Sequence, residues 1–367
     1  MKIMSINTGS SSLKFSLFDM ENNELIASGL FERVTIKGSF YTIKYHGEKI
    51  YEEVEMPNHT VAVKILLDRL VTKGIIKSLD EIGAIGHRLV HGADKYDKSV
   101  IITDEVVEDL RKFSDLAPLH NPANILGIEA AREVLPNVPM VGVFDTAFHQ
   151  TMDEVSYMYP VPYEWYEKYK VRKYGFHGTS HCYISKQIPK LLGREHYKAI
   201  ICHLGSGGSL SAVKDGKCVD TSMGFTPLPG IMMGTRSGDI DPFLGLTEKY
   251  SDFRDVYAGV EAGDEKCILA FNKYVRTVVN YIAMYYVELG GVDAICFTAG
   301  LGENAIPARK AIAEKLSCLG IKLDEEKNNT RGETVEISAK DSTTRLFVIP
   351  TNEELMIATD TYHLLKK

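Results

Sequence analysis

Residues 2–19, KIMSINTGSSSLKFSLFD, combine an apolar strand, a turn of glycine and serine, a second strand and a turn at Asp19. Residues 198–216, KAIICHLGSGGSLSAVKDG, follow the same plan. A short turn of small residues between two apolar runs predicts a β-hairpin. Two hairpins of one design, so far apart in the chain, predict that it is built from two similar halves.

Helices and strands alternate around these hairpins. Helices are predicted from Thr103 to Phe113, from Asn121-Pro122, from Asp264 to Leu289, from Ile306 to Leu319 and after Thr351-Asn352, and buried strands at Pro139–Phe144 and Val292–Phe297. The alternation predicts an α/β fold of two duplicated domains, with ligands at the carboxyl ends of strands in the cleft between them. We place the domains at 1–147, joined by a C-terminal helix at 352–367, and at 148–351.

Composition supports this organisation and narrows the partners. A chain of 367 residues exceeds what one hydrophobic core usually holds. Its net charge of -7 disfavours nucleic acid or an acidic membrane as the main partner, but leaves room for a local basic pocket. The 6 cysteines are scattered without a C-x-x-C pair, and no apolar run suits a signal peptide or a membrane helix. We therefore expect a soluble cytoplasmic protein.

Three glycine turns carry the first functional signal, since the P-loop, zincin and hydrolase motifs are missing. Two are the hairpin turns, and the third is FTAGLGEN at 297–304, between a predicted strand and a predicted helix. Small residues let backbone N–H groups approach phosphate oxygens, although hairpins need glycine anyway. Together the three turns predict nucleotide binding. Phosphate-loop hairpins in duplicated halves resemble the sugar kinase, actin and heat-shock ATPase superfamily.

Two arginines lie among small residues rather than on helix faces. They are Arg88 in GHRLVHG and Arg236 in MGTRSGD. A guanidinium group placed in this way suits a planar carboxylate or a phosphate. The alternative is a structural ion pair with Asp239 or Asp241.

Histidines and carboxylates form the third signal. His120, His149 and His177 stand in LAPLHNP, FDTAFHQ and YGFHGTS, and no spacing matches a zinc site. A lone histidine is more often structural than catalytic. Asp145, at a predicted strand end, and Glu353, in the first turn of the last helix, are candidates to bind magnesium. For Glu353 the alternative is an ordinary first-turn carboxylate.

These segments resemble the acetokinase family, whose members phosphorylate acetate, propionate or butyrate. The matching blocks follow the family's order along nearly the whole chain: INTGSSSLK at 6–14, GHRLVHG at 86–92, LAPLHNP at 116–122, FDTAFHQ at 144–150, YGFHGTS at 174–180, DTSMGFTP at 220–227, MGTRSGDID at 233–241, DFRD at 252–255, 297–304, and PTNEEL at 350–355.

The resemblance implies roles for individual residues. Asn7, Arg88 and Arg236 hold the phosphoryl group and the acetate carboxylate, while His177 donates a hydrogen bond to the phosphoryl group and His120 touches it from the other side. Asn7, Asp145 and Glu353 bind Mg²⁺ or Mn²⁺. The ATP or ADP site comprises Ser10, Ser12, Lys14, His203, Gly205, Ser206, Gly207, Asp252, Phe253, Arg254, Gly300, Gly302, Glu303 and Asn304. The acyl pocket comprises Val90, Leu119, Phe176 and Pro227. Family members are homodimers, which we expect here too.

The implied chemistry suits these residue types. A short carboxylic acid is ionised at pH 7, so it needs no general base to attack phosphorus. It needs cancellation of charge, which arginines and a divalent metal supply. Valine at position 90 leaves less room than alanine, which favours acetate and makes propionate a slow substrate.

Two departures from the family pattern keep alternatives open. Ser206 stands where the family usually has asparagine, and only Leu244–Ser251 fills a stretch that the family uses for a helix. The shortening raises pyrophosphate as an alternative donor, against which the intact Gly300–Asn304 turn argues. A propionate or butyrate kinase is another alternative. So is a chaperone-like or filament-forming ATPase, which would not explain the arginines and histidines.

Overall fold

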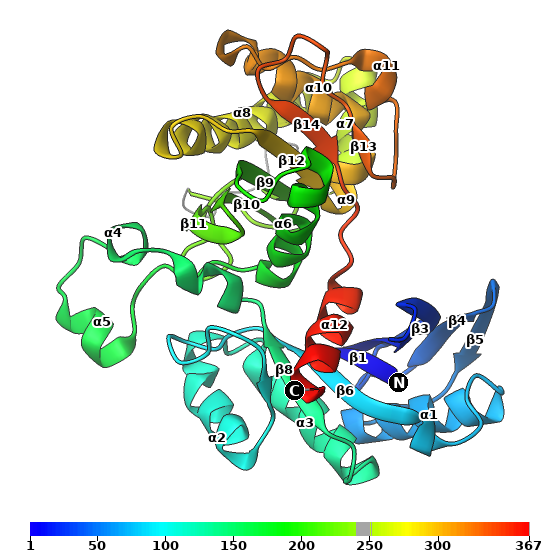
Figure 1. The fold of residues 1–367 in the computed structure, drawn as a ribbon. Coiled ribbons are helices and arrows are strands. Elements are labelled where there is room, and N and C mark those ends of the chain that lie inside the picture. Colours follow the sequence, from blue (N-terminus) through cyan, green and yellow to red (C-terminus); the bar gives the residue numbers. More distant parts are fainter. Residues whose placement is uncertain (240–249, 251, 367) are drawn as a thin grey trace. The chain divides into compact units, whose positions relative to one another are not determined.

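The computed structural model of the chain describes residues 1–239, 250 and 252–366. The chain divides into two compact units, Met1–Ala147 with Asn352–Lys367, and Phe148–Thr351. Each unit contains a mixed β-sheet covered by helices (Figure 1), which confirms the prediction of an α/β fold. No helix within the described ranges has the length and apolar character needed to cross a membrane.

The sheet of the first unit has 8 strands in the order β5-β4-β3-β2-β1-β6-β8-β7. The strands are β1 (Lys2–Gly9), β2 (Ser12–Asp19), β3 (Glu24–Glu32), β4 (Phe40–Tyr45), β5 (Glu48–Glu53), β6 (Ile82–Leu89), β7 (Val100–Ile101) and β8 (Met140–Phe144). Strands β1 to β5 pair antiparallel, whereas β1, β6 and β8 are parallel. The predicted hairpin is present, with Lys2 opposite Asp19 and Gly9 opposite Ser12.

Helices cover both faces of this sheet. They are α1 (His59–Thr72), α2 (Asp104–Lys112), α3 (Asn121–Val134) and α12 (Glu353–Leu365). Apolar side chains of α1 and α3 pack with Met4 and Ile6 of β1 on one face. On the other face, Ile357 and Ala358 of α12 pack against β1, β6 and β8, so the far end of the chain completes the first unit (Figure 1).

The sheet of the second unit repeats this plan. Its 6 strands run in the order β11-β10-β9-β12-β14-β13, with bounds β9 (Lys198–Leu204), β10 (Gly208–Lys214), β11 (Lys217–Thr221), β12 (Ala294–Thr298), β13 (Val335–Glu336) and β14 (Arg345–Val348). Strands β11, β10 and β9 pair antiparallel, β9, β12 and β14 are parallel, and β13 is an antiparallel edge. The series β3-β2-β1-β6-β8-β7 has the same directions, which confirms the predicted duplication.

The helices of the second unit are α4 (Glu154–Tyr157), α5 (Glu164–Tyr169), α6 (Gly178–Leu192), α7 (Phe253–Glu261), α8 (Glu265–Glu288), α9 (Ala299–Asn304), α10 (Ile306–Lys315) and α11 (Glu325–Asn328). Ile184 and Ile188 of α6 pack with Ile201 and Cys296 in the core. The parallel strand β12 is buried along its whole length, as expected for a strand covered on both faces.

Capping residues explain most helix starts. The side chains of Thr103, Asp264 and Asn352 accept hydrogen bonds from the first turns of α2, α8 and α12. The prediction of an open glycine turn at 297–304 was wrong, because residues Ala299–Asn304 form the short helix α9 directly after β12. Ala299 has a left-handed backbone with a φ of 63°, so the chain passes from β12 into α9 without an intervening loop. The predicted shortening at Leu244–Ser251 lies outside the described residues, apart from Tyr250.

Candidate active site

The carboxyl ends of three parallel strands in the first unit carry polar side chains. Asn7 lies in β1, Arg88 in β6, and Asp145 directly after β8. Each stands an even number of residues from a side chain that packs against α12, so period-two alternation places all three on the α12 face. Glu353 opens α12 itself. The structure therefore gathers Asn7, Arg88, Asp145 and Glu353 at one edge of the sheet.

Arg88 and Asp145 form a buried ion pair at this edge. Arg88 Nη2 donates to Asp145 Oδ2 at 2.6 Å, and Nε lies 3.1 Å from the same oxygen. The Asp145 side chain is only 2% exposed. The Asp145 carboxylate raises the pKa of Arg88 above its usual range. Arg88 thus stays cationic and also balances a buried charge, a role that the sequence did not indicate.

Charged groups of both signs surround the buried Glu353 carboxyl group. The pKa of Glu353 is raised to about 7, mainly by burial; Asp145 and Glu354 contribute to the rise, and Arg88 and Lys14 oppose it. Lys14, which we expected near the nucleotide, forms an ion pair with Glu354. A carboxyl group that is costly to ionise beside a second carboxylate favours the binding of a cation.

The donor set at this edge fits a hard divalent metal. Asp145 and Glu353 offer carboxylate oxygens and Asn7 offers an amide oxygen, the ligand types that Mg²⁺ prefers. The described residues contain no group of three or more His, Cys, Asp and Glu side chains that could hold a metal by themselves. Substrate phosphates and water would have to complete the coordination, which is usual for Mg²⁺.

The predicted acyl residues of this unit differ in exposure. Val90, just after β6, is buried, and its N–H donates to Asn124 Oδ1 at 3.1 Å. Asn124 Nδ2 donates to the Thr8 carbonyl at 3.1 Å, so this amide ties the ends of β1 and β6 together. Leu119 is 79% exposed, and His120 occupies the N-cap position of α3.

The first hairpin turn is tight. Gly9 pairs with Ser12, so Ser10 and the next serine form the turn. Ser10 is exposed and Ser12 is partly exposed. The turn is therefore open to solvent at Ser10.

In the second unit, His177 stands at the start of α6 with a left-handed backbone, φ 60°. Its Nδ1 lies 2.8 Å from Ser209 Oγ, and its ring stacks on His203 with centroids 4.2 Å apart. The buried Phe176 carbonyl accepts from His149 Nε2 at 3.0 Å. His149 therefore holds the peptide that precedes His177.

His177 and Arg236 converge on the second hairpin turn. A Cβ placed on Gly207 would lie 3.2 Å from His177 Nε2 and 3.3 Å from Arg236 Nη1. Gly205 N–H donates to the Gly207 carbonyl at 2.9 Å, which closes the turn. An imidazole nitrogen and a guanidinium group thus face a backbone that has no side chain, an arrangement that suits an anion cradle.

Arg236 keeps its charge available. Its Nη1 donates to the Pro227 carbonyl at 3.0 Å, and burial lowers its pKa. Among the described residues it forms no ion pair. Asp239 instead accepts from Tyr281 and from the Gly230 N–H, so the alternative of an Arg236–Asp239 pair is wrong.

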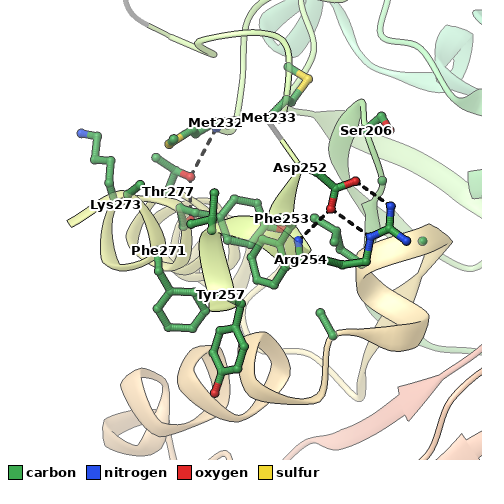
Figure 2. Close-up of a pocket in the computed structure, with 18 of the residues that line it drawn as sticks. Ser206, Met232, Met233, Asp252, Phe253, Arg254, Tyr257, Phe271, Lys273 and Thr277 are labelled. Carbon is green, nitrogen blue, oxygen red and sulfur yellow. Dashed lines mark hydrogen bonds and ion pairs between the residues drawn. The ribbon is translucent and has the colours of Figure 1, made fainter. Parts of the chain in front are cut away.

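A cavity of about 1910 Å³ adjoins this cradle, since Gly205 and Arg236 belong to its lining. Figure 2 shows residues that line this cavity. Its walls include Gly205, Ser206, Arg236, Asp252, Phe253, Arg254, Gly300 and Asn304, all expected near the substrates. Asp252 caps α7 and accepts from Arg254 Nε at 3.0 Å, which fixes the guanidinium group at the cavity wall (Figure 2). Phe253 and Phe271 supply an apolar wall.

Some residues expected at the nucleotide do not line this cavity. His203 is buried behind His177 and lies 2.8 Å from Ser180 Oγ. A Cβ on Gly302 would meet the Phe297 backbone at 3.1 Å, so this glycine serves packing. The Glu303 carboxylate accepts from the Thr351 N–H at 3.1 Å.

Three supporting residues escaped the sequence analysis. Arg309 of α10 donates to the carbonyls of Gly302 and Glu303, both at 2.9 Å. Ser209 bonds to His177 and also to His181. His177 precedes α6 with a left-handed backbone and His181 lies within α6, so their four-residue spacing did not predict that they share a partner. No local pattern indicated Arg309 or Ser209.

A model of the acetokinase family matches residues 2–244 and 242–359. The chain belongs to the acetokinase family. Among curated relatives, the acetate kinase of Clostridium novyi is 52% identical over 397 aligned residues, covering 100% of this chain and 99% of the relative. The acetate kinase of Desulfitobacterium hafniense strain DCB-2 is 51% identical, with full coverage of both chains. These matches confirm the family resemblance.

Solved acetokinase structures share the fold. The acetate kinase of Porphyromonas gingivalis is 40% identical and has a TM-score of 0.95, with 99% of each chain covered. A propionate kinase of Francisella tularensis is also 40% identical, has a TM-score of 0.92 and again covers 99% of each chain. Membership in the acetokinase family implies an adenine nucleotide as substrate and the use of a divalent metal.

The family comparison also locates the shortening. The two matched segments meet at residues 242–244. The Clostridium novyi alignment runs over 397 residues, whereas this chain has 367. The chain therefore lacks acetokinase residues directly after Phe243, as expected from its sequence.

Proposed function

We propose that this acetokinase transfers a phosphoryl group reversibly between ATP and acetate, giving ADP and acetyl phosphate. The observation that carries the proposal is the cradle at Gly207, where His177 Nε2 and a guanidinium group without a carboxylate partner among the described residues converge. A fixed donor and a fixed cation suit the charge that develops on a phosphoryl group in transit.

In the proposed reaction the acetate anion attacks the terminal phosphate of ATP, which is also an anion. Acetate is ionised at neutral pH, so one carboxylate oxygen forms the new bond to phosphorus while the bond between phosphorus and the bridging oxygen of ADP breaks. Arg88 and Arg236 offset the repulsion, and Arg88 holds the acetate carboxylate. His177 donates a hydrogen bond to a phosphoryl oxygen, and His120 touches the group from the other side. A cationic group in such a role is worth about 10³ or more in rate.

Asn7, Asp145 and Glu353 would hold the divalent metal, which we propose to be Mg²⁺. The bound metal supplies positive charge to the phosphate oxygens. Glu353, with its pKa raised to about 7, is the ligand whose ionisation gains most from a cation. Asp145 keeps its orientation through Arg88.

ATP is the proposed donor because the cavity has the features that a nucleoside needs. The capped Asp252–Arg254 segment and the open Gly300 would cradle the adenosine, and a Cβ on Gly300 would meet nothing within 4 Å. Ser206 lines the same cavity and would face the phosphates, together with Gly205 and Gly207. Ser10, Ser12 and Lys14 are further candidates for contacts with the phosphates, and His203, Gly302, Glu303 and Asn304 would support the nucleotide site.

Acetate is the proposed acid, since the buried Val90 narrows the acyl pocket that it would form with Leu119, Phe176 and Pro227. One methylene in such a pocket is worth about 1–3 kcal/mol, so propionate would react slowly. We further propose a cytoplasmic homodimer. Buried thiols such as Cys202 and Cys296, without disulfides, suit a reducing compartment.

Trapping acetyl phosphate with hydroxylamine tests the proposal. With ATP, Mg²⁺ and acetate, we expect acetyl hydroxamate to form. Arg236→Ala should abolish the product, while Arg194→Ala, which removes an exposed arginine of the same unit, should leave it unchanged. No hydroxamate from the parent protein would refute the function, and faster turnover with pyrophosphate than with ATP would refute the donor.

A further inference from the structure

The hydroxyl of Ser209 lies between two imidazole rings. Ser209 Oγ is 2.8 Å from His177 Nδ1 and 2.8 Å from His181 Nε2. Ser209 and His181 are fully buried. The three groups therefore form one hydrogen-bonded chain, His181–Ser209–His177.

A serine hydroxyl has one proton, so this chain can run in two directions. In the first, His181 Nε2–H donates to Ser209, whose hydroxyl donates to His177 Nδ1, and His177 carries its own proton on Nε2. In the second, His177 Nδ1–H donates to Ser209, which donates to His181 Nε2. The second direction leaves either a lone pair on His177 Nε2 or a doubly protonated ring.

The surroundings of His181 favour the first direction. Within the described part of the chain, His181 Nδ1 is buried and has no hydrogen-bond partner. This nitrogen lacks a partner in either direction, but the second direction would place a proton on it and bury an unpaired N–H donor, which is rarer in proteins than a buried acceptor without a partner. Burial lowers the pKa of His181 well below its ordinary value, with smaller effects of His149 and His203, so the ring is neutral.

We propose that Ser209 and His181 are positioning residues that hold His177 as the Nε2–H tautomer and aim this donor at the Gly207 cradle. The inference rests on the proposed function, since it supplies the donor that phosphoryl transfer uses. Nε2 is the nitrogen that would lie 3.2 Å from a Cβ on Gly207. The opposite tautomer would present a lone pair to the phosphoryl oxygens and repel them.

Two further contacts restrain the same ring. His203 stacks on His177 at 4.2 Å, and the His149 Nε2–H holds the preceding carbonyl of Phe176. Arg236 is the cation that faces the same turn. These contacts fix where the ring lies, whereas Ser209 fixes which nitrogen carries the proton.

The test is a long-range ¹H–¹⁵N correlation spectrum of the ¹⁵N-histidine-labelled full chain at pH 8, with the His177 signals identified by their loss in His177→Gln. We expect one tautomer, with the proton on Nε2. A proton on Nδ1, a doubly protonated ring or shifts averaged between two tautomers would overturn the inference. The spectrum needs no substrate, so this result stands apart from any failure to form acetyl phosphate.

Ser209→Ala and Ser211→Ala form a matched pair. Both serines are fully buried on the same face of β10, but Ser211 donates to Thr221 Oγ1 at 3.3 Å instead of a histidine. In Ser209→Ala we expect averaged tautomer shifts for His177 and a fall in kcat of about tenfold, the rate equivalent of one hydrogen bond, with KM changed less than about twofold. In Ser211→Ala the His177 tautomer should not change. Equal spectra for the two folded variants would overturn the role of Ser209.

Discussion

Replacing Arg309 by methionine would test the framework behind the cavity. The Arg309 side chain is fully buried. It donates to Asn328 Oδ1 at 2.8 Å, to the Gly302 and Glu303 carbonyls at 2.9 Å, to the Asn328 carbonyl at 2.8 Å and to the Thr330 carbonyl at 2.9 Å. These bonds join the end of α9 to the last residue of α11 and to Thr330 after it. Methionine keeps the apolar stem of the side chain and removes every donor.

The magnitude follows from what the substitution leaves behind. Burial lowers the pKa of Arg309 to about 10, so the guanidinium group is charged at pH 7. Each acceptor left buried and unpaired costs about 1–3 kcal/mol, but water and local movement will satisfy some of them. A hydrogen bond to a charged group is worth about 1.5–3 kcal/mol, so the loss of two that water does not replace would lower the free energy of unfolding by about 3–6 kcal/mol, which is the loss we expect. For a unit of this size that loss lowers Tm by roughly 6–24 °C.

The assay combines thermal unfolding with titration of ADP. Arg309→Met should lower Tm by this amount. It should also weaken ADP binding, because no guanidinium group then holds the Gly302 and Glu303 carbonyls of α9 in place. The matched control is Lys310→Met, since the neighbouring Lys310 is partly exposed and forms a surface ion pair with Glu325 at 2.8 Å. A surface pair of this kind is worth about 0–1 kcal/mol. If Arg309→Met unfolds within about 1 kcal/mol of the parent, the bonding argument is refuted.

Three other predictions concern the nucleotide, the acid and pH. Ser206→Asn should tighten ADP binding in calorimetry, because the amide reaches further into the cavity; an unchanged Kd would remove position 206 from the phosphate site. Val90→Ala should raise kcat/KM for propionate relative to acetate by about tenfold, and a constant ratio would exclude Val90 from the acyl pocket. Burial lowers the pKa of His87 to about 3. In the unfolded chain the pKa of His87 is about 6.5, so below this pH the unfolded chain binds a proton that the native state does not. The free energy of unfolding therefore falls by about 1.4 kcal/mol per pH unit, down to about pH 3. In His87→Leu, the free energy of unfolding measured with urea should fall less steeply between pH 7 and pH 5, by this amount per pH unit. Equal slopes for the variant and the parent would contradict the argument.

Most of the architecture could be predicted, because its signals are local. Short turns between apolar runs predicted the hairpins at 2–19 and 198–216. The side chains of Thr103, Asp264 and Asn352 cap the helices that follow them. The turn at 297–304 was the exception. Glycines suggested an open loop, but the reversal occurs at one residue, Ala299, and a helix begins there.

The candidate site was predicted only through its motifs. Family blocks named Arg88, Asp145, His177 and Arg236, and their roles stay predictions. No motif showed that Arg88 neutralises Asp145, which makes Arg88→Ala a poor test of catalysis alone, because it would also strand a buried carboxylate. Arg236 forms no ion pair among the described residues, so Arg236→Ala is a better test of catalysis.

The sequence by itself determined the duplicated α/β plan, the acetokinase family and the residue types available for phosphoryl transfer, because strand alternation, turn chemistry and capping act between residues close in the chain. Only the tertiary structure decided which of these residues meet. The Arg88–Asp145 pair spans 57 positions, and the Ser209 hydroxyl in β10 contacts His177 at the start of α6, 32 positions away. Such contacts depend on the packing of whole elements, which brings side chains together without leaving any local pattern.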